Sequence, residues 1–241
     1  MKWYISGDTH GRFTRFAPFI KMNSEEPIGI IILGDAGFNF YLNKTDWRNK
    51  RNTAIYNVTF YCVRGNHEER PENISSMIKV YDEEVQGPVY MEPEFPHIKY
   101  FCDGAEYRLN GARALVLGGA YSIDKWYRLG ALPEDTASWT GWFKDEQLTK
   151  QEMENIDFLY CGEHFDLILA HTCPLSYQPR ELFLSFINQD TVDNTMEKWM
   201  EHFIEQVEFK QFLFGHYHAD KIINEKARMF YKDIVELERI I

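Results

Sequence analysis

Short apolar runs recur along the chain, and each leads into a glycine or a polar residue. They are KWYIS at residues 2–6, IGIIILGD at 28–35, VTFYCVRGN at 58–66 and FDLILAHT at 165–172. Continuous apolar runs of this length are typical of strands that are buried on both faces. Helix-compatible segments at residues 12–23 and 46–56 separate the first three runs. This alternation predicts βαβ units and a largely parallel sheet.

The middle of the chain has a different pattern. Residues 88–95, 98–110 and 111–124 read as shorter strands that are interrupted by turn residues. Asp103-Gly104 and Asn110-Gly111 are typical of tight turns, and an Asn-Gly pair between two apolar runs favours a hairpin. We therefore expect antiparallel strands here. The chain after residue 211 returns to strands and turns.

Two further helices are expected in the second half of the chain. One extends from Asp145 to about His164, and another begins near Asp190 or Thr191, either of which suits an N-cap. Apolar residues along the second helix recur on one face, which is typical of core packing; they are Val192, Met196, Trp199, Phe203 and Val207. No internal repeat or linker interrupts the pattern, so we expect residues 1–241 to form a single domain.

Composition limits the classes of partner. The chain of 241 residues is 44% hydrophobic, which supplies a sizeable core. Its net charge is −11, and the acidic excess is scattered. Binding along a nucleic-acid backbone needs clustered lysine and arginine, so nucleic acid is disfavoured as a partner. A small anionic substrate that is held by a metal stays compatible with this charge.

The cysteines and the apolar runs point to a cytoplasmic protein without a membrane anchor. Cys62, Cys102, Cys161 and Cys173 lie far apart and show no CxxC spacing, so we expect reduced thiols. The first apolar run stops at Gly7, which is too early for a signal peptide. No run approaches the roughly 18 residues of a membrane span.

Side chains that suit metal binding lie at the predicted strand ends. They occur in GDTHG with Asp8 and His10, LGDAG with Asp35, RGNHE with Asn66 and His67, LAHTCP with His171, and FGHYH with His216 and His218. The carboxyl ends of parallel strands meet at one edge of a sheet, so we expect these side chains to lie together. Residues i and i+2 of a strand share a face, which predicts that His216 and His218 point the same way. Imidazole and carboxylate ligands suit Mn, Fe or Zn.

In this order, the motifs from Asp8 to His218 resemble those of the calcineurin-like metallophosphoesterases, and RGNHE is similar to the protein Ser/Thr phosphatase branch. The resemblance implies an α/β fold, a four-layer α/β/β/α sandwich, with two divalent metal ions. It implies that a hydroxide bridging the ions attacks the phosphorus of a phosphate ester. It also implies that Asp35 bridges the ions, and that the other ligands divide into Asp8, His10 and His218 for one ion and Asn66, His171 and His216 for the other.

The resemblance further implies a catalytic role for His67. This residue follows Asn66 directly and should point away from the ligands, as a general acid for the leaving alkoxide or as a stabiliser of the phosphate. Candidates for substrate binding are Asn66, Arg64, Arg12 and Arg128. Guanidinium binds phosphate in a bidentate manner, although each arginine could instead form a salt bridge or a surface charge.

One block departs from the phosphatase branch. That branch has GDxxDRG, whereas this chain has Phe38 in place of the second aspartate and Asn39 in place of the arginine. In the branch, this aspartate supports the catalytic histidine and this arginine contacts phosphate. The departure disfavours a protein phosphatase and leaves the metal ligands untouched.

Three functions remain to be compared. We favour phosphomonoester hydrolysis, because RGNHE resembles the phosphatase branch and no basic tract favours a polynucleotide. The alternatives are a phosphodiesterase on a nucleotide or nucleic-acid end, and a non-catalytic protein that uses the fold as an interaction surface. The complete set of predicted ligands argues against the last. The sequence gives no indication of the natural substrate or the oligomeric state.

Overall fold

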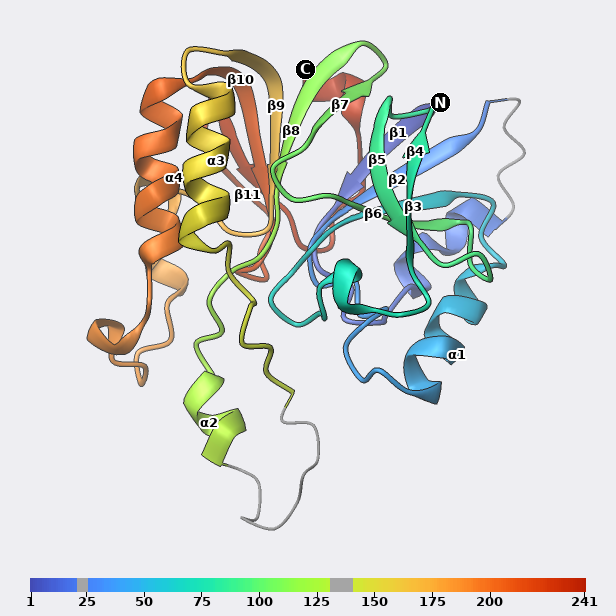
Figure 1. The fold of residues 1–241 in the computed structure, drawn as a ribbon, viewed down its shortest axis with the longest axis horizontal. Helices are drawn as coiled ribbons and strands as arrows, with labels where there is room; N and C mark the ends of the chain where they lie inside the picture. The colour runs from blue at the N-terminus through green and yellow to red at the C-terminus, as the bar shows by residue number, and fades with distance from the viewer. Residues whose placement is uncertain (21–25, 131–140) are drawn as a thin grey trace.

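Two β-sheets lie face to face in the computed structural model, which describes residues 1–20, 26–130 and 141–241. Helices flank the two sheets: α3 (Lys150–Tyr160) and α4 (Thr195–Gln206) on one side and α1 (Lys44–Thr53) on the other (Figure 1). These are the layers of the four-layer α/β/β/α sandwich that the motifs imply. None of the helices in the described parts of the chain combines the length and apolar character that a membrane crossing requires.

The first sheet contains the N-terminal strands. Its order is β13 (Val235–Glu236), β1 (Lys2–Ser6), β2 (Ile28–Leu33), β3 (Thr59–Val63), β6 (Ile98–Phe101), β5 (Gly87–Met91) and β4 (Ile78–Asp82). Strands β1, β2, β3 and β6 are parallel, and the outer strands are antiparallel. Every residue of β2 is buried, which confirms the prediction from its continuous apolar run.

The second sheet contains the later strands. Its order is β11 (Lys221–Asn224), β12 (Ala227–Met229), β10 (Glu208–Phe214), β9 (His164–Ala170), β8 (Ala112–Leu117) and β7 (Glu106–Leu109). Strands β12, β10, β9 and β8 are parallel, so each sheet has a parallel centre. The carboxyl ends of β9 and β10 lead into the LAHTCP and FGHYH motifs.

The middle of the chain differs in part from the expected antiparallel arrangement. The hairpin at Asn110-Gly111 is confirmed, because β7 and β8 are antiparallel and both turn residues have positive φ. Strand β6, however, is parallel to β3, and the turn at Asp103-Gly104 carries the chain into the other sheet instead of closing a hairpin. Asp103 anchors this crossing by accepting hydrogen bonds from Arg64 Nε and Gly118 N.

The helices are shorter than the patterns predicted. They are α1 (Lys44–Thr53), α3 (Lys150–Tyr160) and α4 (Thr195–Gln206), and a further short helix, α2 (Lys125–Gly130), was not predicted. A capping box at Thr149 sets the start of α3. The prediction that α4 begins near Asp190 or Thr191 was wrong, because Asn188 caps a separate 3-10 turn there. The first predicted helix is a 3-10 helix at Thr14–Ile20, and the rest of that prediction reaches residues outside the described ranges.

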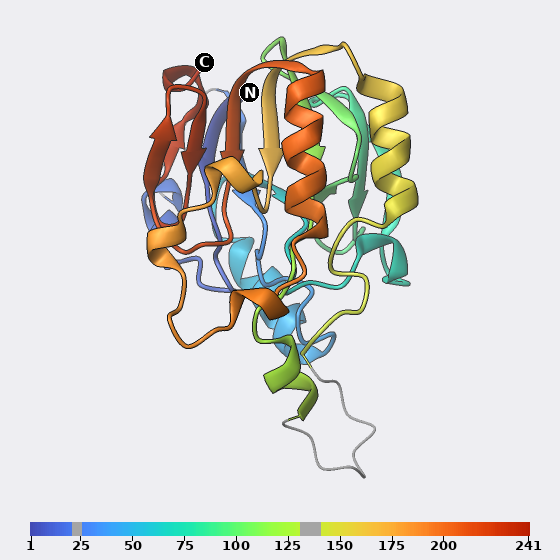
Figure 2. The ribbon, with the colours of Figure 1, turned by 90° about the vertical axis from the view of Figure 1, so that its left-hand side faces the viewer.

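Alternate residues of the buried strands face two apolar layers. In β2, Ile31 and Leu33 lie in the cluster between the sheets, whereas Ile30 and Ile32 lie in the cluster that the first 3-10 helix (Thr14–Ile20) covers. A third cluster lies between the second sheet and helices α3 and α4, which stand side by side in Figure 2. Both sheets contribute to the central cluster, and this shared core is the reason to propose a single domain for residues 1–241.

The turn at Asn110-Gly111 provides a test of the fold. Gly111 has a φ of +87°, and a Cβ atom added there would have no other atom within 4 Å, so Gly111→Ala should cost only backbone strain. We expect a loss of about 1 kcal/mol in the free energy of unfolding, measured by chemical denaturation. Gly130→Ala is the matched control, because this glycine also has open space but no positive φ. Equal stability of both variants would contradict the assigned turn.

Candidate metal centre

The ends of strands β1, β2, β3, β9 and β10 bring the predicted ligands to one place. Asp8 and His10 follow β1, Asp35 follows β2, and Asn66 follows β3. His171 follows β9, and His216 and His218 follow β10. Two clusters form there, and Asp35 lies between them.

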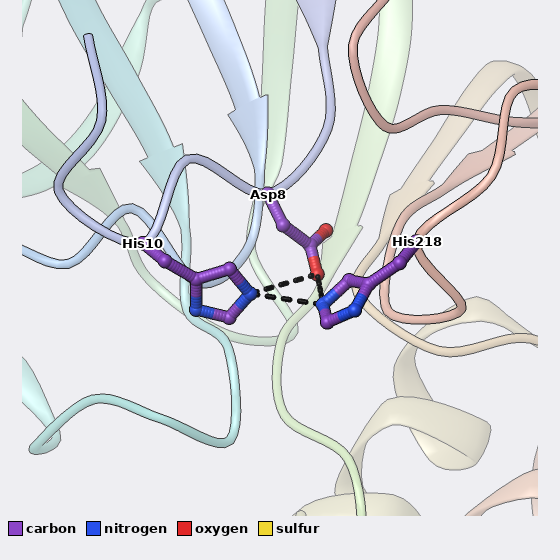
Figure 3. A group of neighbouring side chains, drawn as sticks. All are labelled: Asp8, His10 and His218. Carbon is purple, nitrogen blue, oxygen red and sulfur yellow. Dashed lines mark hydrogen bonds and ion pairs between the residues drawn. The ribbon is translucent and has the colours of Figure 1, made fainter.

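Asp8, His10 and His218 form the first cluster (Figure 3). Asp8 Oδ2 lies 3.2 Å from His218 Nε2 and 3.8 Å from His10 Nε2, and the two imidazole nitrogens are 2.9 Å apart. The other carboxylate oxygen, Oδ1, accepts a hydrogen bond from the backbone of His216. Asp8 Oδ2 is buried, and its ion-pair partners among the described residues are the imidazoles of His218 and His10. A divalent cation between these three side chains would compensate the buried carboxylate more fully than imidazole alone, because uncompensated charge is costly to bury.

Asn66, His171 and His216 form the second cluster, and Asp35 lies between it and the first. Asp35 Oδ2 lies 3.5 Å from His171 Nε2 and 4.0 Å from His10 Nε2, so this oxygen faces residues of both clusters. His171 Nε2 also lies 2.9 Å from Asn66 Oδ1. The ring of His216 packs against that of His171 with 5.0 Å between centroids. The potential metal-ligand atoms of Asp8, Asp35 and His171 lie within 4.8 Å of one another.

The tautomer of His171 follows from its surroundings. Its Nδ1 lies 2.8 Å from the carbonyl oxygen of Leu33, a group that can only accept a hydrogen bond. Nδ1 therefore keeps its proton in either charge state of the ring, and Nε2, directed at Asn66 and Asp35, is the nitrogen that a metal would take. A backbone partner of this kind is the usual support of a metal-binding imidazole.

Burial and charge shift the pKa values of these groups in opposite directions. Burial alone would raise the pKa of Asp35, but His171 and His67 outweigh it, and its pKa lies well below the usual value. Burial opposes protonation of His171, yet Asp35 and Asp8 raise its pKa to about 9. Burial and then the charge of His171 lower the pKa of His216 to about 3. His216 is thus neutral and able to bind a metal, and incoming ions would displace a proton from His171.

Close approach of the strand ends depends on glycine. A Cβ atom on Gly34 would collide with the ring of His171, and one on Gly65 would collide with Asp35. A Cβ atom on Gly215 would meet Asp8 Oδ1. These glycines therefore allow the backbones to pass within reach of the charged groups.

His216 and His218 do not share a face in the way that a strand would require. Strand β10 ends at Phe214, and both histidines have positive φ, 70° and 53°. His216 lies beside His171, whereas His218 lies beside Asp8 and His10. The alternation of strand side chains therefore does not extend into this turn, and it is not the reason why both histidines reach the site. The turn directs one histidine toward each cluster, which is the division that the resemblance implies.

Comparison with known proteins agrees with this geometry. The family model of the calcineurin-like phosphoesterases matches residues 1–220. The chain belongs to this family. It is accordingly a hydrolase of phosphoric esters that uses divalent metal ions, and the clusters around Asp8 and Asp35 are candidate metal sites.

Comparisons with curated proteins and with solved structures give no closer assignment than the family. No curated protein matches the chain. A crystal structure of the phosphopantetheinyl hydrolase from Mycobacterium tuberculosis is similar at 13% identity, with a TM-score of 0.41. The alignment covers 96% of this chain and 90% of that one.

The predicted substrate-binding residues have different surroundings. Arg64 is buried, and its guanidinium donates to Asp103 and to two backbone carbonyls, so it is not available to a phosphate. Arg128 is paired with Asp124, and its guanidinium lies 5.7 Å from the centre of the Phe40 ring, which packs on His67. Arg12 is exposed. The amide nitrogen of Asn66 donates to Ser122 Oγ rather than facing the opening of the site.

Glu68 is a supporting residue that the sequence motifs did not reveal. It is fully buried, and Oε1 accepts hydrogen bonds from Gly37 N and the Tyr100 hydroxyl. Its Oε2 accepts one from Gly65 N at 3.3 Å. One carboxylate thus joins the loop of Asp35 to the loop of Asn66. The glutamate of RGNHE was visible in the sequence, but its partners were not.

A second support that the motifs did not reveal lies beyond His218. The carboxylate of Asp220 accepts hydrogen bonds from the backbone of Tyr231, Lys232 and Asp233. The ring of Tyr231 stacks on His218 with 5.0 Å between centroids. Arg15 donates to the carbonyl oxygens of Tyr231 and Asp8. The C-terminal segment therefore braces His218 and, through Arg15, the backbone of Asp8.

The role of Glu68 can be tested with Glu68→Gln. The new amide group would turn a donor toward the backbone N–H groups of Gly37 or Gly65, which leaves a buried donor without a partner. We expect a loss of about 1–3 kcal/mol in the free energy of unfolding, together with weaker Mn²⁺ binding, measured by calorimetry. Glu94→Gln is the control, because Glu94 lies on the surface, where it accepts a hydrogen bond from Trp47 Nε1 away from the site. Equal behaviour of both variants would refute the role of Glu68.

Proposed function

We propose that the protein hydrolyses phosphomonoesters at a centre of two metal ions that share Asp35. The observation that carries this proposal is the position of Asp35 Oδ2, which faces His171 on one side and His10 on the other. A carboxylate between two ligand clusters is the arrangement expected of a bridging ligand. The preference for monoesters rests on RGNHE and on the lack of a basic tract for a polynucleotide.

The side chains present suit such ions. Asp8, His10 and His218 would hold one ion, and Asn66, His171 and His216 would hold the other, with Asp35 common to both. Two features support this assignment: the imidazoles of His10 and His218 face the buried oxygen of Asp8, and His216 is neutral. Imidazole with carboxylate favours Mn, Fe or Zn. When bound, two such ions lower the pKa of a water toward neutrality and neutralise phosphate charge.

His67 is the proposed proton donor to the leaving alkoxide. The backbone N–H of His67 donates a hydrogen bond to Asp35 Oδ1. The imidazole ring of His67 is half-buried, and its Nε2 lies 4.0 Å from Asp35 Oδ2. Burial lowers the pKa of His67, and the charges of Arg128 and His10 add to this. An arriving phosphate anion opposes that shift, because a nearby negative charge favours the protonated imidazole.

Two arginines remain proposed contacts of the substrate. Arg128 lies near His67, across the ring of Phe40, and its charge reaches the imidazole. Arg12 is exposed directly after GDTHG. A guanidinium in either place would stabilise phosphate charge, and Arg128 has the stronger support.

The cellular setting is part of the proposal. All the cysteines are free thiols, and Cys62, Cys102 and Cys173 are buried. Reduced thiols are typical of a cytoplasmic protein. The net charge of −11 continues to disfavour nucleic acid as a partner.

Asp35→Asn tests the bridged centre. The change keeps the shape of the side chain and removes the charge that both clusters share, so we expect metal content to fall from about two ions per chain. Hydrolysis of p-nitrophenyl phosphate should fall by at least about a hundredfold. Elemental analysis and the assay are run after Mn²⁺ reconstitution, with Asp190→Asn on the surface as the control.

The same assay with bis-p-nitrophenyl phosphate compares ester classes. A larger kcat/KM for the monoester is the expected result. A larger value for the diester would favour the phosphodiesterase alternative. Reconstituted wild-type protein with neither metal nor activity would contradict the proposed function.

His67→Ala tests proton donation separately from metal binding. We expect both ions to remain and turnover of alkyl phosphates to fall by about 10²–10⁴. The loss should be smaller for p-nitrophenyl phosphate, because its leaving group needs less protonation. His97→Ala is the control, since His97 contacts Thr53 away from the site. Unchanged turnover with both kinds of leaving group would exclude His67 as the donor.

A further inference from the structure

A buried chain of hydrogen bonds connects Asn66 to the middle of the sequence. Asn66 Nδ2 donates to Ser122 Oγ at 2.8 Å, and Ser122 Oγ donates to Glu146 Oε2 at 2.5 Å. The backbone N–H of Ser122 donates to Glu146 Oε1 at 3.1 Å. Asn66, Ser122 and Glu146 are 2%, 2% and 3% exposed, so water does not compete with these bonds.

The chemistry of these groups fixes their directions. An ionised carboxylate only accepts, so the single proton of the Ser122 hydroxyl points to Glu146. The oxygen of that hydroxyl is then left to accept from Asn66, and only the nitrogen of the amide can donate. Asn66 Oδ1 consequently faces His171 Nε2, and so points into the second cluster of candidate ligands. An amide that rotated by half a turn would lose its bond to Ser122.

Glu146 is itself held in place. Its carbonyl oxygen accepts hydrogen bonds from Arg64 Nη1 at 2.7 Å and from Ala120 N at 3.2 Å. Arg64 is anchored in turn by Asp103, which marks the crossing between the sheets. The arginine of RGNHE therefore supports Glu146, and this explains why it is not directed at the opening of the site.

We propose that Ser122 and Glu146 are positioning residues that orient the Asn66 amide, so that its oxygen faces a metal ion and its nitrogen is withheld from the substrate. This inference rests on the proposed function, because it requires an ion at Asn66. Ser122 and Glu146 touch neither the ion nor the substrate. They act by making one orientation of the amide more stable than the other.

Ser122→Ala removes the acceptor that distinguishes the two orientations. We expect one of the two Mn²⁺ ions to bind about tenfold to a hundredfold more weakly, which is the usual effect of losing a support behind a metal ligand. The ion at Asp8, His10 and His218 should keep its affinity. Titration calorimetry on metal-free protein measures both ions. KM for p-nitrophenyl phosphate should change less than kcat.

Control variants separate positioning from stability. Thr53→Val also removes a buried hydroxyl, which donates to Lys50 O in α1 away from the site, and should leave both affinities unchanged. Ser122→Thr retains the hydroxyl and should restore Mn²⁺ binding. Glu146→Gln is the alternative variant if Ser122→Ala does not fold, because glutamine has the same shape as glutamate. Its amide group can donate to Ser122 Oγ, so the serine proton is free to point at Asn66 and the preference for one amide orientation is lost.

The outcomes distinguish this inference from the proposed function. Wild-type protein with two ions, together with unchanged Mn²⁺ affinities in Ser122→Ala and Glu146→Gln, would overturn the positioning role. A lower melting temperature with unchanged affinities would also overturn it, since it would show a purely structural role. Wild-type protein that binds no Mn²⁺ would overturn the proposed function itself, and the inference with it.

Discussion

The burial of Asp8 and Asp35 at the junction of the two sheets is the constraint on which the site depends. These carboxylates are almost fully buried and lie within the same small cluster of donor atoms. Like charges in such a place are unstable unless cations face them. Without metal, protonated His171 balances part of this charge, as its raised pKa shows. The same buried negative charge makes the site suited to divalent ions, because one such ion neutralises more charge than a protonated imidazole and occupies less space.

The fold meets this demand by joining parallel strands from both sheets at one edge. Strands β1, β2 and β3 supply candidate ligands from the first sheet, and β9 and β10 supply them from the second. Glycine at Gly34, Gly65 and Gly215 allows this close approach. Hydrogen bonds behind the ligands then hold the loops together: Glu68 joins two loops of the first sheet, and Asp220 and Arg15 brace the C-terminal turn. Residues from distant parts of the sequence thus support the site.

The sequence was informative where chemistry is local. Continuous apolar runs indicated the buried strands, and the polar residues at their ends indicated candidate ligands such as Asp8 and His171 that the structure brings together. Prediction failed for features that depend on contacts between distant parts of the chain, such as strand pairing and helix ends. The parallel pairing of β6 with β3 and the start of α4 depend on partners far along the chain or on a competing cap.

The support residues show the same limit. Arg64 has the pattern of a phosphate ligand, but Asp103 and Glu146 determine its orientation, and no motif marks either of them. No motif marks Ser122 either, and its hydrogen bonds with Asn66 and Glu146 join parts of the chain that meet only when the protein has folded. Likewise, the turn after β10 separates His216 from His218 through positive φ values that strand alternation does not include.

Anomalous diffraction from crystals grown with Mn²⁺ would locate the ions themselves and so decide whether Asp35 is shared. We expect two peaks, on either side of Asp35 and about 3.5–4 Å apart, one beside His218 and the other beside His171. A single peak, or two peaks that do not share Asp35, would contradict the bridged centre.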